Sequence, residues 1–154
     1  KGAHRRRYRK TTERDPEAAP APDLMNRDFT ATGLDQKYVA DITYVRTWEG
    51  WLYCCAILDV GSRRVVGWAM ADHMRAELVC DALKMAVRAR RPRPGLVFHA
   101  DRGSQYTSAD LRGLLGTHKM LQSLAAPGQC WDCDDAGMAI FSMRGSPGPP
   151  ARTA

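Results

Sequence analysis

The sequence predicts a mixed α/β domain built on a five-stranded sheet, and three observations lead to this prediction. Three apolar, β-branched runs follow one another with short turns between them, which is typical of an antiparallel meander. The apolar period then becomes helical. Two further short apolar runs follow, separated by a second helical stretch. A right-handed crossover after the meander would place the fourth strand beside the first.

The meander is predicted over residues 38–45, 51–58 and 64–70. These runs are rich in the Val, Ile, Tyr and Trp residues that strands favour. Glu49-Gly50 forms the first turn, and residues 59–63 form the second. Because the turns are short, we expect each of the three strands to pair antiparallel with the next one in the sequence.

The second half of the domain alternates helices with strands. Residues 75–90 carry apolar side chains at helical spacing, and Pro92 stops that helix. We expect a strand at 95–100, a short helix at 109–117 and a last strand at 119–124.

Two aspartates fall where the predicted topology brings strands together. Asp41 lies in the centre of the first strand, and Asp101 ends the fourth. Neighbouring strands lie about 4.8 Å apart, so the two carboxylates could share divalent metal ions. The alternative for Asp41 is a buried carboxylate that only accepts hydrogen bonds from backbone amides.

Net charge and composition limit the classes of partner that this chain could bind. The 154 residues carry a net charge of +6, and residues 1–22 hold seven Lys or Arg against three acidic residues. This pattern suits a nucleic-acid partner or a solvated basic arm equally. No apolar run has the length of a membrane span, and no signal peptide is visible, so we expect a cytoplasmic protein without a membrane partner. We expect a basic arm and linker at 1–22, a core at 23–143 and a disordered tail at 144–154.

The five cysteines show no paired framework, and we interpret them as reduced thiols. Cys130-x-x-Cys133 lacks a second pair of ligands at suitable spacing, so no zinc site is expected.

Several ordered blocks carry a family resemblance between residues 23 and 132. The quoted blocks are Val39-Ala-Asp-Ile-Thr-Tyr44, Glu49-Gly-Trp-Leu-Tyr53, the segment 58–70, and His99-Ala-Asp-Arg-Gly-Ser-Gln-Tyr106. Together they resemble the integrase core of insertion-sequence transposases, of the bacterial two-reading-frame type related to retroviral integrases. Shorter matches occur at Asn26-Arg-Asp-Phe29, Glu77-Leu-Val79 and Gln129-Cys-Trp-Asp132.

The resemblance implies a ribonuclease-H-like fold, with a five-stranded mixed sheet and helices on both faces. It also implies a triad of Asp, Asp and Glu that holds two Mg²⁺ or Mn²⁺ ions for the cleavage and strand transfer of transposon-end DNA. By motif, the two aspartates are Asp41 and Asp101, and Asp59 has a structural role. The family works as a homo-oligomer on DNA in the bacterial nucleoid. Further candidates for DNA contact, each with a core or turn role left open, are His99, Arg102, Gln105 and Tyr106.

The third carboxylate is missing from this pattern. The family places thirty-five residues between its second Asp and the Glu, and the matching position here is Gly137. No Glu follows Glu77. Asp134, three residues before Gly137, could share a helical face with it, whereas Asp132 and Asp135 are less well placed. We therefore predict that this copy is catalytically impaired. The missing Glu would reflect decay of the copy, a frameshift or a sequencing error. The alternatives are a non-catalytic nucleic-acid-binding remnant and a ribonuclease-H-like nuclease.

Overall fold

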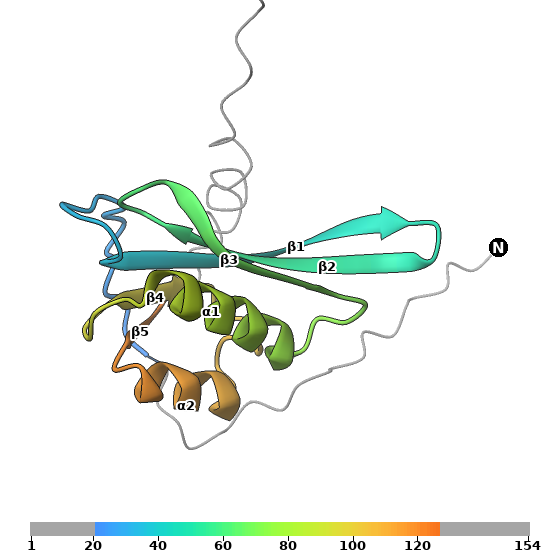
Figure 1. Ribbon diagram of the computed structural model, residues 1–154. Helices are drawn as coiled ribbons and strands as arrows, with labels where there is room; N and C mark the ends of the chain where they lie inside the picture. Colours follow the sequence, from blue (N-terminus) through green and yellow to red (C-terminus); the bar gives the residue numbers. More distant parts are fainter. Residues whose placement is uncertain (1–20, 127–154) are drawn as a thin grey trace, which may run out of the picture.

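A computed structural model describes residues 21–126, and Figure 1 shows their arrangement around one sheet. The predicted arm, tail and Gly137 lie outside the described residues. The order of strands and helices is the predicted one. The elements are β1 (Lys37–Thr47), β2 (Gly50–Asp59), β3 (Arg64–Ala71), α1 (Ala76–Arg90), β4 (Val97–Ala100), α2 (Ala109–Thr117) and β5 (Leu121–Leu124).

The sheet has the strand order β3-β2-β1-β4-β5. Strands β1, β2 and β3 pair antiparallel, as the short turns between them require. After the crossover through α1, β4 lies parallel to β1, and β5 lies parallel to β4. The predicted meander and the predicted contact between the first and fourth strands are therefore confirmed.

The hairpin of β1 and β2 is longer than predicted. Its pairing continues from Thr43 opposite Cys54 to Thr47 opposite Gly50. Strand β1 pairs with β4 only as far as Val39, so the outer half of the hairpin projects beyond the rest of the sheet (Figure 1). Gly50 allows the tight turn, because its φ of 133° is a conformation that side chains disfavour.

Both helices cover the same face of the sheet (Figure 1), where their apolar sides form the core with Tyr38, Ile57 and Phe98. Gly67 of β3 shows how closely α1 packs, because a Cβ at Gly67 would lie 2.2 Å from the carbonyl oxygen of Ala82. Within residues 21–126 the second helical layer implied by the resemblance is not present.

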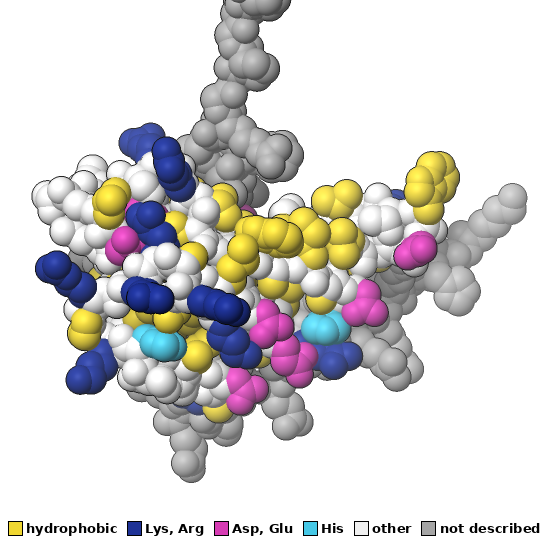
Figure 2. All heavy atoms as spheres, viewed as in Figure 1, with side chains coloured by type: hydrophobic (Ala, Val, Ile, Leu, Met, Phe, Trp, Pro, Cys, Tyr) yellow, Lys and Arg dark blue, Asp and Glu magenta, His cyan; other side chains and the backbone are white. Residues whose placement is uncertain are grey.

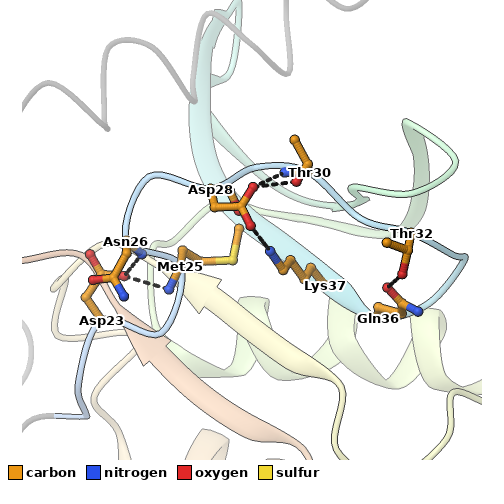
Figure 3. Close-up of polar contacts among 8 residues, drawn as sticks. All are labelled: Asp23, Met25, Asn26, Asp28, Thr30, Thr32, Gln36 and Lys37. Carbon is orange, nitrogen blue, oxygen red and sulfur yellow. Dashed lines mark hydrogen bonds and ion pairs between the residues drawn. The ribbon is translucent and has the colours of Figure 1, made fainter.

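The segment before β1 contacts β4 and β5 through the Phe29 ring on His99 and the Leu24 N–H bond to Ser123, and its own hydrogen bonds hold its shape (Figure 3). The Asp23 carboxylate accepts bonds from the backbone N–H of Met25 and Asn26, at 2.9 and 3.1 Å. Asp28 accepts bonds from Thr30 and, at 3.0 Å, from the Lys37 ammonium. These donors lower the pKa of Asp28 to about 2.

Asp59 is the last residue of β2 and lies at the end of the sheet opposite the hairpin tip. Its carboxylate has no exposed surface and accepts hydrogen bonds from the backbone N–H of Asp35, Gly61 and Ser62. The Ser62 hydroxyl donates another at 2.6 Å, and the Arg90 guanidinium lies 3.6 Å away. The structural role predicted for Asp59 at the strand turn is therefore confirmed.

The cysteines Cys54, Cys55 and Cys80 are free thiols, as expected, whereas Cys130 and Cys133 lie outside the described residues. Burial raises the pKa of Cys55 to about 12, so this thiol stays protonated at neutral pH. Among residues 21–126, neither helix has the length and apolar character needed to cross a membrane.

Candidate functional site

Strand β1 presents Asp41 at the point where the strand leaves the core. Tyr38 and Ala40 face the helices, so the alternating side chains Val39 and Asp41 face the opposite side of the sheet. The strand is buried through Ala40 and exposed from Thr43 onward. Asp41 therefore lies half-buried at the boundary, where a carboxylate can be held by the fold and still reach an external ligand.

Asp101 follows the last residue of β4. The parallel register pairs Val39 with His99, and Asp41 and Asp101 each lie two residues beyond this last pair. The charge of Asp101 acts on the Asp41 carboxyl, so the two carboxylates lie near each other.

The protonation of Asp41 reflects this arrangement. Burial raises the pKa of the Asp41 carboxyl, and the negative charge of Asp101 raises it further, while the backbone N–H of Ile42 works in the opposite direction. Within residues 21–126 no Lys or Arg forms an ion pair with either carboxylate. Two acids that repel each other without a neighbouring cation form a site that gains from binding one.

Gly103 fixes the orientation of Asp101. Its backbone N–H donates a 2.8 Å hydrogen bond to Asp101 Oδ1. A Cβ on Gly103 would lie 2.9 Å from that oxygen and 2.7 Å from Gln105 Oε1, so only glycine fits without displacing them. Gly103 is not among the predicted site residues, although the Asp-x-Gly order favours a bond from the glycine N–H to the carboxylate two residues before it.

The loop after Asp101 is tied to two neighbouring segments. The buried Gln105 donates through Nε2 to the carbonyl oxygen of Met74, at 3.1 Å, in the connection between β3 and α1. Arg102 is half-buried and donates through Nε to the carbonyl oxygen of Ala125 after β5. These bonds hold the Asp101 loop in place, and contact of either side chain with DNA stays a prediction.

His99 and Tyr106 are both buried. His99 Nδ1 lies 2.9 Å from Ser123 Oγ, and the ring meets Phe29 edge-on with 6.0 Å between ring centres. Tyr106 belongs to the hydrophobic core, and its carbonyl oxygen accepts a 2.6 Å bond from Gln122. Both residues thus connect β4 and the loop after it to β5, and their contact with DNA also stays a prediction.

The chemistry of the pair suits a hard divalent cation. Mg²⁺ and Mn²⁺ prefer carboxylate oxygen, and Mg²⁺ commonly binds through one or two carboxylates while it keeps several waters. Residues 21–126 contain no group of three His, Cys, Asp or Glu side chains that could hold a metal ion. The donor set therefore fits part of the expected metal site, and Asp132, Asp134, Asp135 and Gly137 lie outside the described residues.

Comparison with known proteins agrees with the fold and with the motifs. The family model for the integrase core domain matches residues 31–130. The chain is 49% identical over 111 residues to the transposase InsF of insertion sequence IS3A from Escherichia coli strain K12. It is 42% identical over 128 residues to an uncharacterized 31 kDa protein of insertion element IS600 from Shigella sonnei.

These matches cover most of this chain but not most of the relatives. They span 71% and 83% of this chain, against 38% of the IS3A transposase and 47% of the IS600 protein. The chain therefore spans less than half the length of these two curated relatives.

Solved structures show the same fold at low sequence identity. The HTLV-2 integrase catalytic core domain, solved in complex with magnesium, has a TM-score of 0.56 and 12% identity over 74% of this chain and 85% of that one. A chain of the simian T-cell lymphotropic virus intasome has a TM-score of 0.65 and 12% identity over 83% of this chain and 44% of that one. These similarities confirm the predicted ribonuclease-H-like fold.

Proposed function

Because the chain belongs to the integrase core domain family, we propose that it is the DNA-processing core of an insertion-sequence transposase, with Asp41 and Asp101 as its catalytic carboxylates. The observation that carries this proposal is the closeness of two aspartates, on the central strand β1 and just after β4, that form no ion pair with a Lys or Arg of residues 21–126. The substrates are the DNA ends of the transposon and a target DNA, bound by a homo-oligomer in the bacterial cytoplasm.

Asp41 and Asp101 would hold Mg²⁺ or Mn²⁺ through their carboxylate oxygens. A divalent ion there supplies a more acidic attacking water or 3′-hydroxyl and neutralises charge on the scissile phosphate. The fold keeps Asp101 Oδ1 oriented through Gly103, and the half-buried position of Asp41 limits access of water to the pair. The raised pKa of Asp41 makes metal binding compete with a proton, so binding should strengthen as the pH rises.

We further propose that this copy transfers strands poorly or not at all, because Gly137 stands where the family has its third carboxylate. Glycine has no side chain that could bind the second ion. With only two carboxylates, the chain should bind DNA and one metal ion more readily than it performs chemistry.

The test is a strand-transfer assay with Mn²⁺ on duplexes carrying the terminal repeats of the chain's own element. We expect no product above background, but we expect Mn²⁺ binding by calorimetry that Asp41→Asn and Asp101→Asn each abolish. The matched control is Asp81→Asn on the exposed face of α1, which should bind Mn²⁺ like the unmodified chain. Robust strand transfer that Asp41→Asn abolishes would refute the impairment and keep the proposed function. Unchanged Mn²⁺ binding in both variants would refute the metal site itself.

A nicking assay on plasmid that lacks transposon ends distinguishes the proposed transposase core from a ribonuclease-H-like nuclease. A nuclease would nick such plasmid with Mn²⁺, whereas the proposed transposase core should leave it intact.

A further inference from the structure

The projecting half of the β1–β2 hairpin, residues 44–53, is the largest feature of the described chain that the carboxylate site leaves unexplained. We call it the ribbon. Its two strands pair only with each other over most of their length. Hydrophobic side chains gather over the strands toward this end of the molecule (Figure 2). Tyr44, Val45, Trp48 and Trp51 are all exposed by about half or more of their surface.

Most of the aromatic side chains on the ribbon have a structural role. Tyr44 lies opposite Tyr53, and Arg46 lies opposite Trp51. The ring centres of Tyr44 and Trp51 are 5.3 Å apart at 79°, and the Arg46 guanidinium carbon lies 6.0 Å from the Trp51 centre. Cross-strand pairs of this kind stabilise a two-stranded hairpin that has no further strand beside it.

Trp48 has no such role. It occupies the two-residue turn, and its relative exposure of 105% means that nothing in residues 21–126 shields it. The turn is held firmly, because the Thr47 hydroxyl donates a 2.9 Å hydrogen bond to the Gly50 carbonyl oxygen. Trp48 buries no surface in the described fold, and with the exposed Tyr44 and Val45 it belongs to an apolar patch of the kind that marks an interaction site.

The ribbon continues directly from the carboxylate site. Strand β1 loses its neighbour β4 after Val39, so the free edge of β1 begins beside Asp41 and runs to the tip. Seven residues at about 3.3 Å each place Trp48 about 23 Å from Asp41. That length corresponds to about seven base pairs of duplex at about 3.4 Å per pair. A duplex whose phosphate lies at the carboxylates and whose axis follows β1 would therefore meet the tip.

We infer that the ribbon is a second DNA-contacting element, which enters a groove of the same duplex roughly seven base pairs from the carboxylates, with Trp48 and Arg46 as its principal contacts. The major groove, about 12 Å wide, admits a two-stranded β-ribbon. The Arg46 guanidinium can reach a phosphate, and the indole of Trp48 can stack on or wedge between bases. This inference rests on the proposed action on DNA. Continuity with the carboxylate site favours DNA over a second copy of the chain.

The inference is tested by photocrosslinking with the full chain and a fluorescein-labelled duplex of about 30 base pairs, long enough to span both contacts. The photoreactive residue p-benzoylphenylalanine replaces Trp48, Thr43 or Leu34 in turn. Thr43 lies two residues from Asp41 and reports DNA at the carboxylate site, whereas Leu34 is 60% exposed at the opposite end of the sheet and is the matched control. We expect crosslinks to DNA from positions 48 and 43 and none from position 34.

The outcomes separate this inference from the proposed function. DNA crosslinks from position 43 without any from position 48 would overturn the ribbon contact and leave the DNA-processing core standing. Crosslinks from position 48 to protein alone would assign the ribbon to a second copy and overturn the inference. The absence of DNA crosslinks from both positions would overturn both proposals.

Affinity provides the second measurement. Trp48→Ala should weaken binding of the duplex about ten-fold by fluorescence anisotropy, because the loss of one base–aromatic contact is of that order. Its melting temperature should be unchanged, because Trp48 is fully exposed. Leu34→Ala should bind the duplex like the unmodified chain. Equal affinity of the Trp48→Ala variant and the unmodified chain would contradict the inference.

Discussion

Asp59 and Asp41 lie on adjacent strands, and the difference between their surroundings separates a structural carboxylate from a functional one. Asp59 is fully buried, accepts hydrogen bonds from several donors, and has Arg90 at 3.6 Å. Asp41 is half-buried, has one backbone donor, and faces the like charge of Asp101. The fold satisfies the first carboxylate, whereas the second is left to be satisfied by a ligand.

The contrast also appears in how the neighbouring residues are used. The Asp35 backbone N–H donates to Asp59, and the Asp35 carboxylate is itself satisfied. Arg90 donates to Asp35 Oδ1 at 2.9 Å, and the Tyr38 hydroxyl donates to the same oxygen at 2.6 Å. Around Asp101, Gly103 donates to one carboxylate oxygen, and Arg102 is directed to the carbonyl oxygen of Ala125. Arg90 therefore offsets part of the negative charge at the structural site, whereas no Lys or Arg of residues 21–126 forms an ion pair with Asp41 or Asp101, as suits the binding of a divalent cation.

The largest expected effect is a loss of stability on removal of the structural carboxylate Asp59. Asp59→Ala should lower the free energy of unfolding by about 3–5 kcal/mol, because it leaves buried donors and the Arg90 charge without their acceptor. Chemical denaturation measures this loss. Asp41→Ala is the matched control and should cost far less. Equal losses in the two variants would mean that Asp41 is also a structural carboxylate.

An intermediate effect is expected at Gly103. Gly103→Ala should weaken Mn²⁺ binding about ten-fold, because the new Cβ displaces the Asp101 carboxylate that Gly103 now orients. The free energy of unfolding should fall by less than about 1 kcal/mol, since both crowded atoms are ends of side chains that can move.

Gly113→Ala in α2 is the control for Gly103→Ala, because its Cβ would meet nothing within 4 Å. It should leave Mn²⁺ binding unchanged and slightly raise stability, as alanine favours a helix. Calorimetric titration of both variants checks the pair. Unchanged Mn²⁺ affinity in Gly103→Ala would mean that Asp101 does not need this orientation.

The fold and the carboxylate pair were predictable from the sequence because they depend on local patterns. The apolar runs and short turns define the meander, and the handedness of the crossover sets β4 beside β1. Asp41 and Asp101 then each lie two residues beyond the last pair of β1 and β4. None of these steps requires knowledge of side-chain packing.

The remaining features depend on contacts between distant segments. The partners of His99 are Ser123, in β5, and Phe29, in the segment before β1, and no local pattern joins the three. The projection of the hairpin follows from where β1 stops pairing with β4, which the alternation of side chains in β1 does not reveal. Only the family spacing, and no structural feature of residues 21–126, bears on Gly137.

The smallest expected effect is the response of Asp41 to pH. Its pKa is raised in the folded chain above the ordinary value of 3.8, so the folded state holds this proton more tightly than the unfolded state does. The ionised carboxylate therefore destabilises the fold at neutral pH. Asp41→Asn should raise the free energy of unfolding at pH 7 by less than about 1 kcal/mol, because solvent screens a half-buried group.

This advantage of Asp41→Asn should shrink as the pH falls through the raised pKa of Asp41 toward 3.8, where the unmodified side chain also becomes neutral. Urea unfolding in metal-free buffer at a series of pH values from about 7 downward measures the trend. Glu49→Gln is the control, because it removes the same negative charge at an exposed position. It shows how much of the stability change comes from net charge alone. If Asp41→Asn instead lowers stability at pH 7, Asp41 resembles Asp59, and the distinction between the two carboxylates fails.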